Sequence, residues 1–379
     1  MTTGPAEGGP ANGSVGGPVA GLASRATADS AAIPAFPVPR AGSRRVAAID
    51  CGTNSLRLLI ADADPARGEL TDLSRRMEIV RLGQGVDATG RLAADALART
   101  LGVLAEYADA ISQAGATAVR MVATSATRDA SNAAEFVSGV VGVLGVPPEV
   151  ISGAAEARLS FTGATAELAG TADPPAGELP PPYLVVDIGG GSTEFVVGGR
   201  GSGAPGPGSG APGPGSGPES ELQAVSTDIG CVRMTERHLH ADPPTAAEVA
   251  AATADIDAAI ESAARAVPVA AAATLVGLAG SVTTVAAIAL GLTSYDPARI
   301  HHARIPASEV HQVSQLLLGQ TRQQRAAIGP MHPGRVDVIG AGALVLDRIL
   351  TRLGFAEVIA SEHDILDGIA WSLAAPDGS

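Results

Sequence analysis

The sequence predicts an α/β protein with two similar halves and a cleft between them. Strand-like and helix-like segments alternate along most of its 379 residues, a length that suits two ordinary domains. A glycine turn flanked by acidic residues, "LVVDIGGGSTEFVVGG" (184–199), has a counterpart near the start of the folded region. Related motifs in two halves of a chain are typical of a duplicated domain.

The first half is expected to begin with two strands that a tight turn joins, within residues 44–64. Helical and extended segments then alternate, as the spacing of their apolar residues indicates. The first of the helices is expected to end at Gly115, since glycine commonly terminates helices. The helices of this half are predicted at 94–115, 132–145 and 154–168, and its further strands at 118–126 and 149–152.

A proline-rich connector at 172–182 separates the two halves. We therefore predict an N-terminal domain over residues 44–172 and a C-terminal domain over residues 173–379. The second half repeats the mixture of strands and helices, with paired strands around its glycine turn. Its other elements are predicted as a helix at 244–266, a strand and a helix within 273–290, and helices from there to the end.

Two segments have a composition that cannot build a core. Residues 1–43 are rich in glycine, alanine, proline and serine and are predicted to be a disordered tail. Residues 199–220 repeat glycine, proline and serine and are predicted to be a flexible loop between two strands. A third segment, 267–295, is uncharged, but its proline, glycines and small residues favour a buried strand and helix over a membrane span.

The composition argues against several classes of function. Hydrophobic residues make up 46% of the chain, enough for sizeable cores, and the formal net charge is −14. Such a charge argues against nucleic acid or an acidic membrane surface as a partner. The chain contains no lysine, so it has neither the lysine of a phosphate-binding P-loop nor the amine that Schiff-base enzymes need.

The cysteines and the N-terminus bear on the cellular compartment. Cys51 and Cys231 are far apart and fit no metal-binding spacing, so we expect two buried free thiols in a reducing compartment. The first residues lack the basic and apolar regions of a secretory signal. We therefore expect a cytoplasmic protein.

The two glycine turns correspond to each other residue by residue. In each, an apolar strand ends in aspartate, glycine and serine follow at the same spacing, and a second apolar run begins. The matching pairs are Asp50 with Asp187, Gly52 with Gly189 and Ser55 with Ser192. Because the second run is β-branched and has no helix cap, each turn is expected to join a β-hairpin. Its glycines would let backbone N–H groups converge on an anion, with Thr53 and Thr193 as hydroxyl donors.

Two such hairpins that face each other across a cleft would bind consecutive phosphates, whereas either copy alone could be a plain hairpin turn. Asp50 and Asp187 end their strands beside the glycines, and alternation places Ser192 and Glu194 on one face of the strand, toward the cleft. Carboxylates there would repel a bare phosphate, which implies a bound cation. Mg²⁺ suits oxygen ligands and phosphate, with Mn²⁺ as the alternative. A third glycine turn, "GLAGS" (277–281), would add another wall.

With these motifs the chain resembles the exopolyphosphatase/guanosine pentaphosphatase family, within the actin-like ATPase superfamily of sugar kinases and Hsp70. The matching stretches span about residues 45–370 and are specific as an ordered set. They are "AIDCGTNSLRLLI", "ATSATRDASN", "ISGAAEARLSF", "LVVDIGGGSTEFVVG", "DIGCVRMTE" and "GLAGSVTT". The resemblance implies an α/β fold of two ribonuclease-H-like domains with the active site in the cleft between them. It also implies release of terminal phosphate from polyphosphate with Mg²⁺.

The resemblance further implies roles for individual residues. Glu156 precedes the alanine of the family's "SGxxEA" motif. This is the position of the family's general base, which orients water toward the terminal phosphorus. Asp50, Asp187 and Glu194 match acids of the phosphate loops and are the expected metal ligands. The expected phosphate-binding residues are Gly52, Thr53, Asn54, Ser55, Arg57, Arg128, Gly189, Gly190, Gly191, Ser192, Thr193, Gly280 and Ser281.

Some of these residues have plainer interpretations. Glu156 lies at a predicted helix start, where the helix dipole favours an acid in any case. Arg128 could instead form a surface ion pair. His301 and His302 stand where the family tends to have His-Gly and are interpreted as surface residues without a role. Asp364 and Asp367 of "EHDILDG" (362–368) are expected to belong to a final helix that packs back on the first domain.

The expected function is that of a cytoplasmic, Mg²⁺-dependent exopolyphosphatase. Short chains are the expected substrate, because longer family members have further helical domains after the "EHDILDG" helix. Guanosine pentaphosphate, or the tetraphosphate, presents a similar phosphate tail and is the alternative ligand, which would connect the protein to the stringent response. A non-catalytic sensor of polyphosphate or an alarmone is an alternative of another class, although Glu156 would cost a pure anion binder affinity. A homodimer is also expected.

Overall fold

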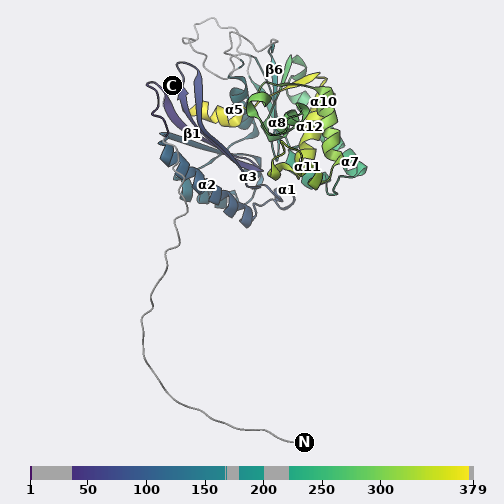
Figure 1. The fold of residues 1–379 in the computed structure, drawn as a ribbon, viewed down its shortest axis with the longest axis horizontal. Coiled ribbons are helices and arrows are strands. Elements are labelled where there is room, and N and C mark those ends of the chain that lie inside the picture. The colour runs from purple at the N-terminus through teal and green to yellow at the C-terminus, as the bar shows by residue number, and fades with distance from the viewer. Residues whose placement is uncertain (2–35, 167, 169–178, 200–221, 375–379) are drawn as a thin grey trace. The chain divides into compact units, whose positions relative to one another are not determined.

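Two β-sheets packed against helices organise the described part of the chain (Figure 1). The computed structural model describes residue 1 and residues 36–166, 168, 179–199 and 222–374. Residues Pro37–Ser379 belong to one compact unit. Most of the predicted tail (1–43) and of the predicted loop at 199–220 lies outside the described residues.

The first sheet is built around β1 (Arg44–Cys51), which is buried along almost its entire length. β1 pairs antiparallel with β2 (Ser55–Asp64) and parallel with β4 (Ala118–Ala123). β3 (Glu69–Ile79) pairs with β2, and the short β5 (Glu149–Val150) pairs with β4. The resulting order is β3-β2-β1-β4-β5.

The second sheet repeats the centre of the first. Its strands are β6 (Tyr183–Ile188), β7 (Thr193–Gly198), β8 (Gln223–Thr227), β9 (Thr274–Leu278), β10 (Arg304–Pro306) and β11 (Glu357–Ala360), in the order β10-β11-β9-β6-β7-β8. β6 pairs antiparallel with β7 and parallel with β9, as β1 does with β2 and β4. This shared arrangement agrees with the duplication that the two glycine turns predict.

Helices surround both sheets. Those before the second glycine turn are α1 (Val86–Thr89), α2 (Ala94–Ala114), α3 (Ser125–Asp129), α4 (Ala133–Leu144) and α5 (Gly153–Thr165). Those after it are α6 (Cys231–His238), α7 (Ala246–Ala266), η1 (Val269–Ala271), α8 (Ala279–Ala289), α9 (Pro297–Ile300), α10 (Ala307–Gly319), α11 (Arg322–Ala326), η2 (Pro333–Arg335), α12 (Ile339–Leu353) and α13 (Ile365–Ala374).

The last helix, α13, packs against the first sheet. Its residues Ile365 and Ile369 belong to one buried cluster with Val46 of β1 and Leu59 of β2. Figure 1 shows this yellow helix beside β1, although the two are at opposite ends of the sequence. Helix α13 therefore completes the core of the half of the molecule that contains β1 and β2.

Helix α5 lies between the second sheet and α13. Its Ala157 and Phe161 pack with Tyr183 and Val196 of the second sheet in a buried cluster. Its other face meets α13 at very short range, because a Cβ atom on Gly163 would overlap the carbonyl oxygen of Asp364. Close packing on two sides fixes the position of this helix, which carries the predicted catalytic glutamate.

The predicted fold class is confirmed: the protein is α/β with two sheets of related arrangement. The strand pair at 44–64 and the helices near 94–115, 132–145, 154–168 and 244–266 are confirmed with small shifts of their ends. The strand predicted at 118–126 stops at Ala123 and gives way to α3. The division into domains at 172/173 stays a prediction.

Three strands were absent from the prediction. β3 is largely exposed and carries five charged residues in "ELTDLSRRMEI", so its sequence lacks the apolar pattern of a buried strand. β10 and β11 are three and four residues long and lie in a region predicted to be helical. Short strands between helices leave too few residues to show a twofold periodicity.

The uncharged segment at 267–295 forms β9 and α8, with the strand and most of the helix buried, as predicted. Among the residues that the structure describes, no helix is long and apolar enough to cross a membrane. Cys51 and Cys231 are both buried and unbridged, which confirms their predicted state.

Candidate active site

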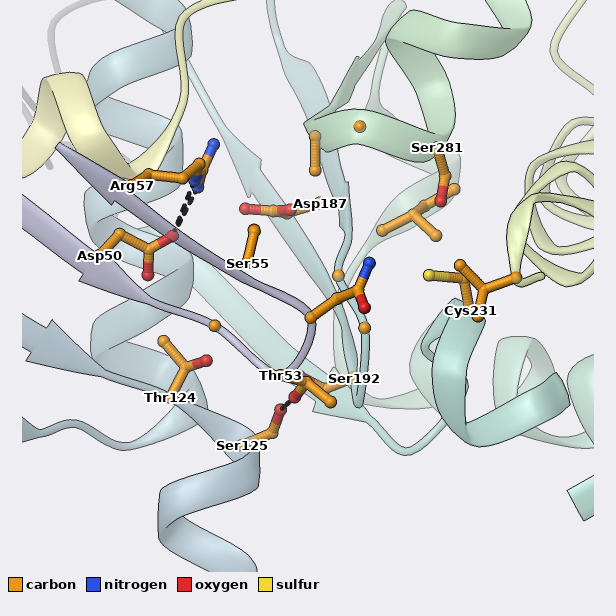
Figure 2. Close-up of a pocket in the computed structure, with 18 of the residues that line it drawn as sticks. Asp50, Thr53, Ser55, Arg57, Thr124, Ser125, Asp187, Ser192, Cys231 and Ser281 are labelled. Atoms are coloured by element: carbon orange, nitrogen blue, oxygen red, sulfur yellow. Dashed lines mark hydrogen bonds and ion pairs between the residues drawn. The ribbon is translucent and has the colours of Figure 1, made fainter. Parts of the chain in front are cut away.

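A cleft of about 760 Å³, its open mouth included, lies between the glycine turns at the ends of β1 and β6 (Figure 2). Residues from all three predicted glycine turns line it, together with the predicted catalytic glutamate. The predicted site residues among the lining are Asp50, Gly52, Thr53, Asn54, Ser55, Arg57, Glu156, Asp187, Gly189, Gly190, Ser192, Gly280 and Ser281. The fold thus brings together residues that lie far apart in the sequence.

The first two glycine turns have the same backbone hydrogen bond. The N–H of Gly52 donates to the carbonyl oxygen of Ser55 at 3.0 Å, and the N–H of Gly189 donates to that of Ser192 at 3.1 Å. Each turn joins two antiparallel strands, β1 to β2 and β6 to β7. The prediction that both are hairpin turns, and that neither opens a helix, is confirmed.

The two turns touch each other. A Cβ atom on Gly190 would stand 2.8 Å from Cβ of Thr53, and one on Gly191 would stand 2.8 Å from Oγ1 of Thr53. Glycine is therefore required at both positions because the first turn approaches so closely. Oγ1 of Thr53 in turn forms a 2.8 Å hydrogen bond with Oγ of Ser125, at the start of α3 (Figure 2).

Arg57, which was predicted to bind phosphate, is held between two buried aspartates. Its Nε and Nη2 donate to Oδ2 of Asp50 at 2.9 and 2.7 Å, and its Nη1 donates to Oδ2 of Asp364 (Figure 2 shows the first pair). Burial raises the pKa of Asp50 despite the nearby guanidinium. Burial would also raise the pKa of Asp364, but Arg57 and the backbone N–H of Leu366 outweigh it and lower that pKa. Most hydrogen-bonding capacity of Arg57 is thus already in use.

Glu156 lies in the first turn of α5, where Ser152 caps the helix by accepting a hydrogen bond from the N–H of Ala155. Arg128 donates to the backbone oxygen of Ile151 at 3.0 Å and to Oε2 of Glu156 at 3.4 Å. Burial, followed by the charge of Glu194, raises the pKa of Glu156 well above its ordinary value. The plainer interpretation of Arg128 as an ion-pair residue is thus borne out, but its partner is the candidate base and the pair is partly buried.

Two further carboxyls of the site are buried and bonded to serines. Ser160 donates to Oδ2 of Asp187 at 2.6 Å, and Ser226 donates to Oε1 of Glu194 at 2.6 Å. Burial, followed by the charge of Asp364, raises the pKa of Asp187 to about 6. Burial, followed by the charge of Asp187, raises the pKa of Glu194 to about 8. The site's own residues therefore supply too little positive charge to keep both carboxyls fully ionised.

The third glycine turn brings an unpredicted arginine to the cleft. Ala279 adopts a φ of +67°, a value that is uncommon for residues with a Cβ atom. A Cβ atom on the next residue, Gly280, would overlap the guanidinium of Arg335. Arg335 lines the cleft and donates to Oγ1 of Thr284 at 3.2 Å. Ser281 and Cys231 lie opposite Asp50 in Figure 2.

Four predicted site residues do not line the cleft, namely Arg128, Gly191, Thr193 and Glu194. Thr193 is fully buried, and its Oγ1 donates to the backbone oxygen of Ile229 at 3.1 Å. The predicted hydroxyl contact of Thr193 with phosphate is therefore corrected. Strand alternation predicts that the Glu194 side chain points into the cleft. Instead it accepts a hydrogen bond from Ser226 and does not line the cleft.

Sequence reasoning missed several residues that contribute to the site. Ser125 stands within the quoted motif "ATSATRDASN", so a signal for it existed. Arg335 follows Pro-Gly in a stretch with no recognised pattern, and only the fold brings it to the cleft. Asp364 was predicted merely as part of a final helix, because nothing local indicates that it bonds with Arg57.

The chemistry of the cleft fits a bound cation. Three carboxyls line the cleft, those of Asp50, Glu156 and Asp187. Two guanidiniums also line it, those of Arg57 and Arg335. Oδ1 of Asp50 is buried and has no hydrogen-bond partner among the described residues. Within that same part of the chain, no three His, Cys, Asp or Glu side chains form a complete metal site. Mg²⁺ typically uses one or two carboxylates and completes its shell with phosphate and water.

Comparison with known proteins is consistent with this geometry. The model of the Ppx/GppA phosphatase family matches residues 59–375. Exopolyphosphatase 2 of Mycobacterium tuberculosis is 51% identical over 342 residues, which cover 87% of this chain and 98% of that protein.

Solved structures agree. An exopolyphosphatase-like protein is 42% identical with a TM-score of 0.77, covering 88% of this chain and 98% of that one. The PPX-GPPA enzyme of Aquifex aeolicus is 30% identical with a TM-score of 0.67, covering 87% of this chain and 99% of that one. The resemblance that the sequence motifs indicated is thereby confirmed, and the chain belongs to the Ppx/GppA phosphatase family.

Proposed function

We propose that the protein is an exopolyphosphatase that releases orthophosphate from the end of short polyphosphate chains. The observation that carries this proposal is the pair of matching glycine hairpins in contact with each other, with the Glu156 carboxyl beside them in one cleft. The name of the relative from Mycobacterium tuberculosis supports the same activity.

In this proposal the hairpin turns bind the phosphate chain. Backbone N–H groups of residues 53–55, Gly190 and Ser192, with the hydroxyls of Ser55 and Ser192, donate to the phosphate oxygens. Arg335 adds a guanidinium from η2, beside Gly280 of the third turn. Arg57 stays bonded to Asp50 and Asp364 and offsets their charge near the substrate.

Glu156 orients a water molecule toward the terminal phosphorus and accepts its proton. The water oxygen forms a bond to phosphorus while the bond between that phosphorus and the bridging oxygen breaks. Orthophosphate leaves, and the remaining chain is shorter by one unit. Arg128, bonded to Oε2 of Glu156 and to the Ile151 carbonyl oxygen, holds the carboxyl in place.

Mg²⁺, with Mn²⁺ as the alternative, would be held by Asp50 and Asp187 and would neutralise phosphate charge as it develops. Glu194, which the sequence predicts as a ligand, is not one in this proposal, because one of its oxygens accepts a hydrogen bond from Ser226 and it does not line the cleft. A cytoplasmic location and a homodimer stay predictions.

The test is phosphate release with Mg²⁺ from tripolyphosphate, long polyphosphate and guanosine pentaphosphate, measured in parallel. The proposal predicts the highest kcat/KM on the short polyphosphate. Binding of all three without any release would contradict an enzyme and favour the sensor alternative instead.

Guanosine pentaphosphate is the second candidate substrate because a second cavity adjoins the cleft. This cavity, about 1030 Å³ with its mouth, shares Arg57, Gly280 and Arg335 with the cleft. Met77, Tyr295 and Met331 give it an apolar wall that could receive a nucleoside. A higher kcat/KM on guanosine pentaphosphate than on tripolyphosphate would favour this candidate.

Mg²⁺ is expected to raise the thermal unfolding midpoint of the metal-free protein, because a ligand that binds only the folded state stabilises it. The Asp50→Asn variant should lose most of this increase, since the unpartnered Oδ1 of Asp50 is a proposed ligand atom. Asp347→Asn is the matched control, because Asp347 is a buried acid of α12 that does not line the cleft. Equal Mg²⁺ shifts in both variants would exclude Asp50 as a ligand.

A further inference from the structure

The motif "DIGCVRMTE" (228–236) has no part in the proposed chemistry, yet it contacts each glycine carbonyl of the second turn. These carbonyls all accept hydrogen bonds from the beginning of α6. Cys231 N donates to Gly189 O at 2.9 Å, Val232 N to Gly190 O at 2.8 Å, and Nε of Arg233 to Gly191 O at 2.7 Å. The backbone N–H of Arg233 also reaches Gly190 O at 3.1 Å.

These contacts set the direction of the turn's N–H groups. In a trans peptide the C=O and N–H point to opposite sides of the chain. With the carbonyls of residues 189–191 directed at α6, the N–H groups of residues 190–192 point away from it. Gly190 and Ser192 line the cleft. The contacts with α6 therefore favour an orientation in which the turn presents N–H groups to an anion.

Arg233 also connects the second glycine turn to α1 and α3, which lie beside the first turn. Its Nη1 donates to Oδ1 of Asp87 at 2.7 Å, and its Nη2 donates to Oδ2 of Asp129. Asp87 belongs to α1, and Asp129 ends α3, the helix that carries Ser125. Because Ser125 is bonded to Thr53 of the first turn, one guanidinium connects both phosphate turns. Its side chain is only 13% exposed.

The residue before α6 allows this close approach. A Cβ atom on Gly230 would overlap the backbone of Gly190 and Gly191. No movement of a flexible side chain could relieve that overlap, because the opposing atoms are backbone. The start of α6 and the second turn are thus matched in shape as well as in hydrogen bonding.

We propose that Arg233 is a positioning residue that holds the second phosphate turn in its anion-binding orientation and at a fixed distance from the first. It touches no substrate itself and acts through Gly191, Asp87 and Asp129. The inference rests on the proposed function only for the identity of the substrate, since any phosphate ligand of the cleft would depend on the same turn.

The experiment measures two quantities on the full chain: the Kd of orthophosphate with Mg²⁺, by calorimetry, and KM and kcat for tripolyphosphate. Arg233→Gln should raise the Kd and the KM by about tenfold or more, as expected for loss of charge-assisted hydrogen bonds that orient several donors. The effect on kcat should be smaller than the effect on KM. Arg233→Lys should fall between wild type and Arg233→Gln, because one ammonium cannot replace the planar fork.

Arg237→Gln is the matched control. Arg237 lies one turn further along α6 and also bonds Asp87, but its other partner is Asp255, and no hydrogen bond joins it to the glycine turn in the described residues. Both variants lose one positive charge and one ion pair with Asp87. Arg237→Gln should keep the orthophosphate Kd within about twofold of wild type, the ordinary size of a surface effect.

Two results would overturn the inference. One is an Arg233→Gln protein with the thermal midpoint of the control and an unchanged orthophosphate Kd. The other applies if Arg233→Gln does not fold. Asp129→Asn is then measured instead, and a wild-type orthophosphate Kd in that variant would contradict the connection between the turns. Failure of the proposed function looks different: wild type then releases no phosphate from tripolyphosphate, while the orthophosphate Kd still tests Arg233.

Discussion

Replacing Glu156 with glutamine is expected to slow phosphate release from tripolyphosphate by about 10²- to 10⁴-fold, the usual contribution of a general base. Glutamine has the same shape, so the contact with Arg128 can persist through its amide oxygen. What the amide cannot do is accept a proton from the attacking water. The measurement is kcat by phosphate release under saturating substrate and Mg²⁺.

The same substitution should not weaken substrate binding or stability. Burial and the charge of Glu194 raise the pKa of Glu156, which means that its charged form is disfavoured in the fold. A neutral amide removes this penalty and one repulsion against phosphate. We therefore expect Glu156→Gln to unfold at the same or a higher temperature than wild type, with KM unchanged or lower.

Glu135→Gln is the matched control because Glu135 also lies in the first turn of a helix but is exposed and away from the cleft. It should leave kcat near wild type. If Glu156→Gln keeps a wild-type kcat, the carboxyl is a helix-dipole feature and not the base. A large loss of both stability and activity would instead assign it a structural role.

Much of the site was predictable because its signals are local. The pattern of Asp50, Gly52 and Ser55, repeated at Asp187, specifies a strand, a hairpin turn and another strand within a dozen residues. Glu156 follows a serine cap that is visible in the sequence. Such features depend on neighbours in the chain, and the structure places them as expected.

The rest depends on contacts between distant residues. Arg57 and Asp364 are separated by 307 positions, so no local pattern connects them. The predicted phosphate ligand Arg57 therefore turned out to have two acidic partners. Thr193 has the right type and spacing for a donor, yet the neighbouring backbone at Ile229 takes its hydroxyl. A sequence shows which groups are available, whereas packing decides which of them reach the cleft.

Asp364→Asn is expected to lower the free energy of unfolding by about 2–3 kcal/mol, the range for a buried hydrogen bond between charged groups. Asp364 is 4% exposed and bonds Arg57 from the residue just before α13. The amide leaves the guanidinium with Asp50 as its remaining acid, so part of the buried positive charge loses its compensation. Urea unfolding followed by circular dichroism measures the change.

A double-mutant cycle separates this ion pair from a general loss of α13 packing. Arg57→Gln, Asp364→Asn and the double variant should give a coupling free energy of about 1–3 kcal/mol, because each single change leaves a buried charge that the double change removes. Independent, additive effects would mean that Asp364 stabilises only the start of α13, through the N–H of Leu366. In the coupled case, Asp364, just before α13, stabilises Arg57 beside Asp50. Disrupting α13 should then weaken Mg²⁺ and phosphate binding before the sheets unfold.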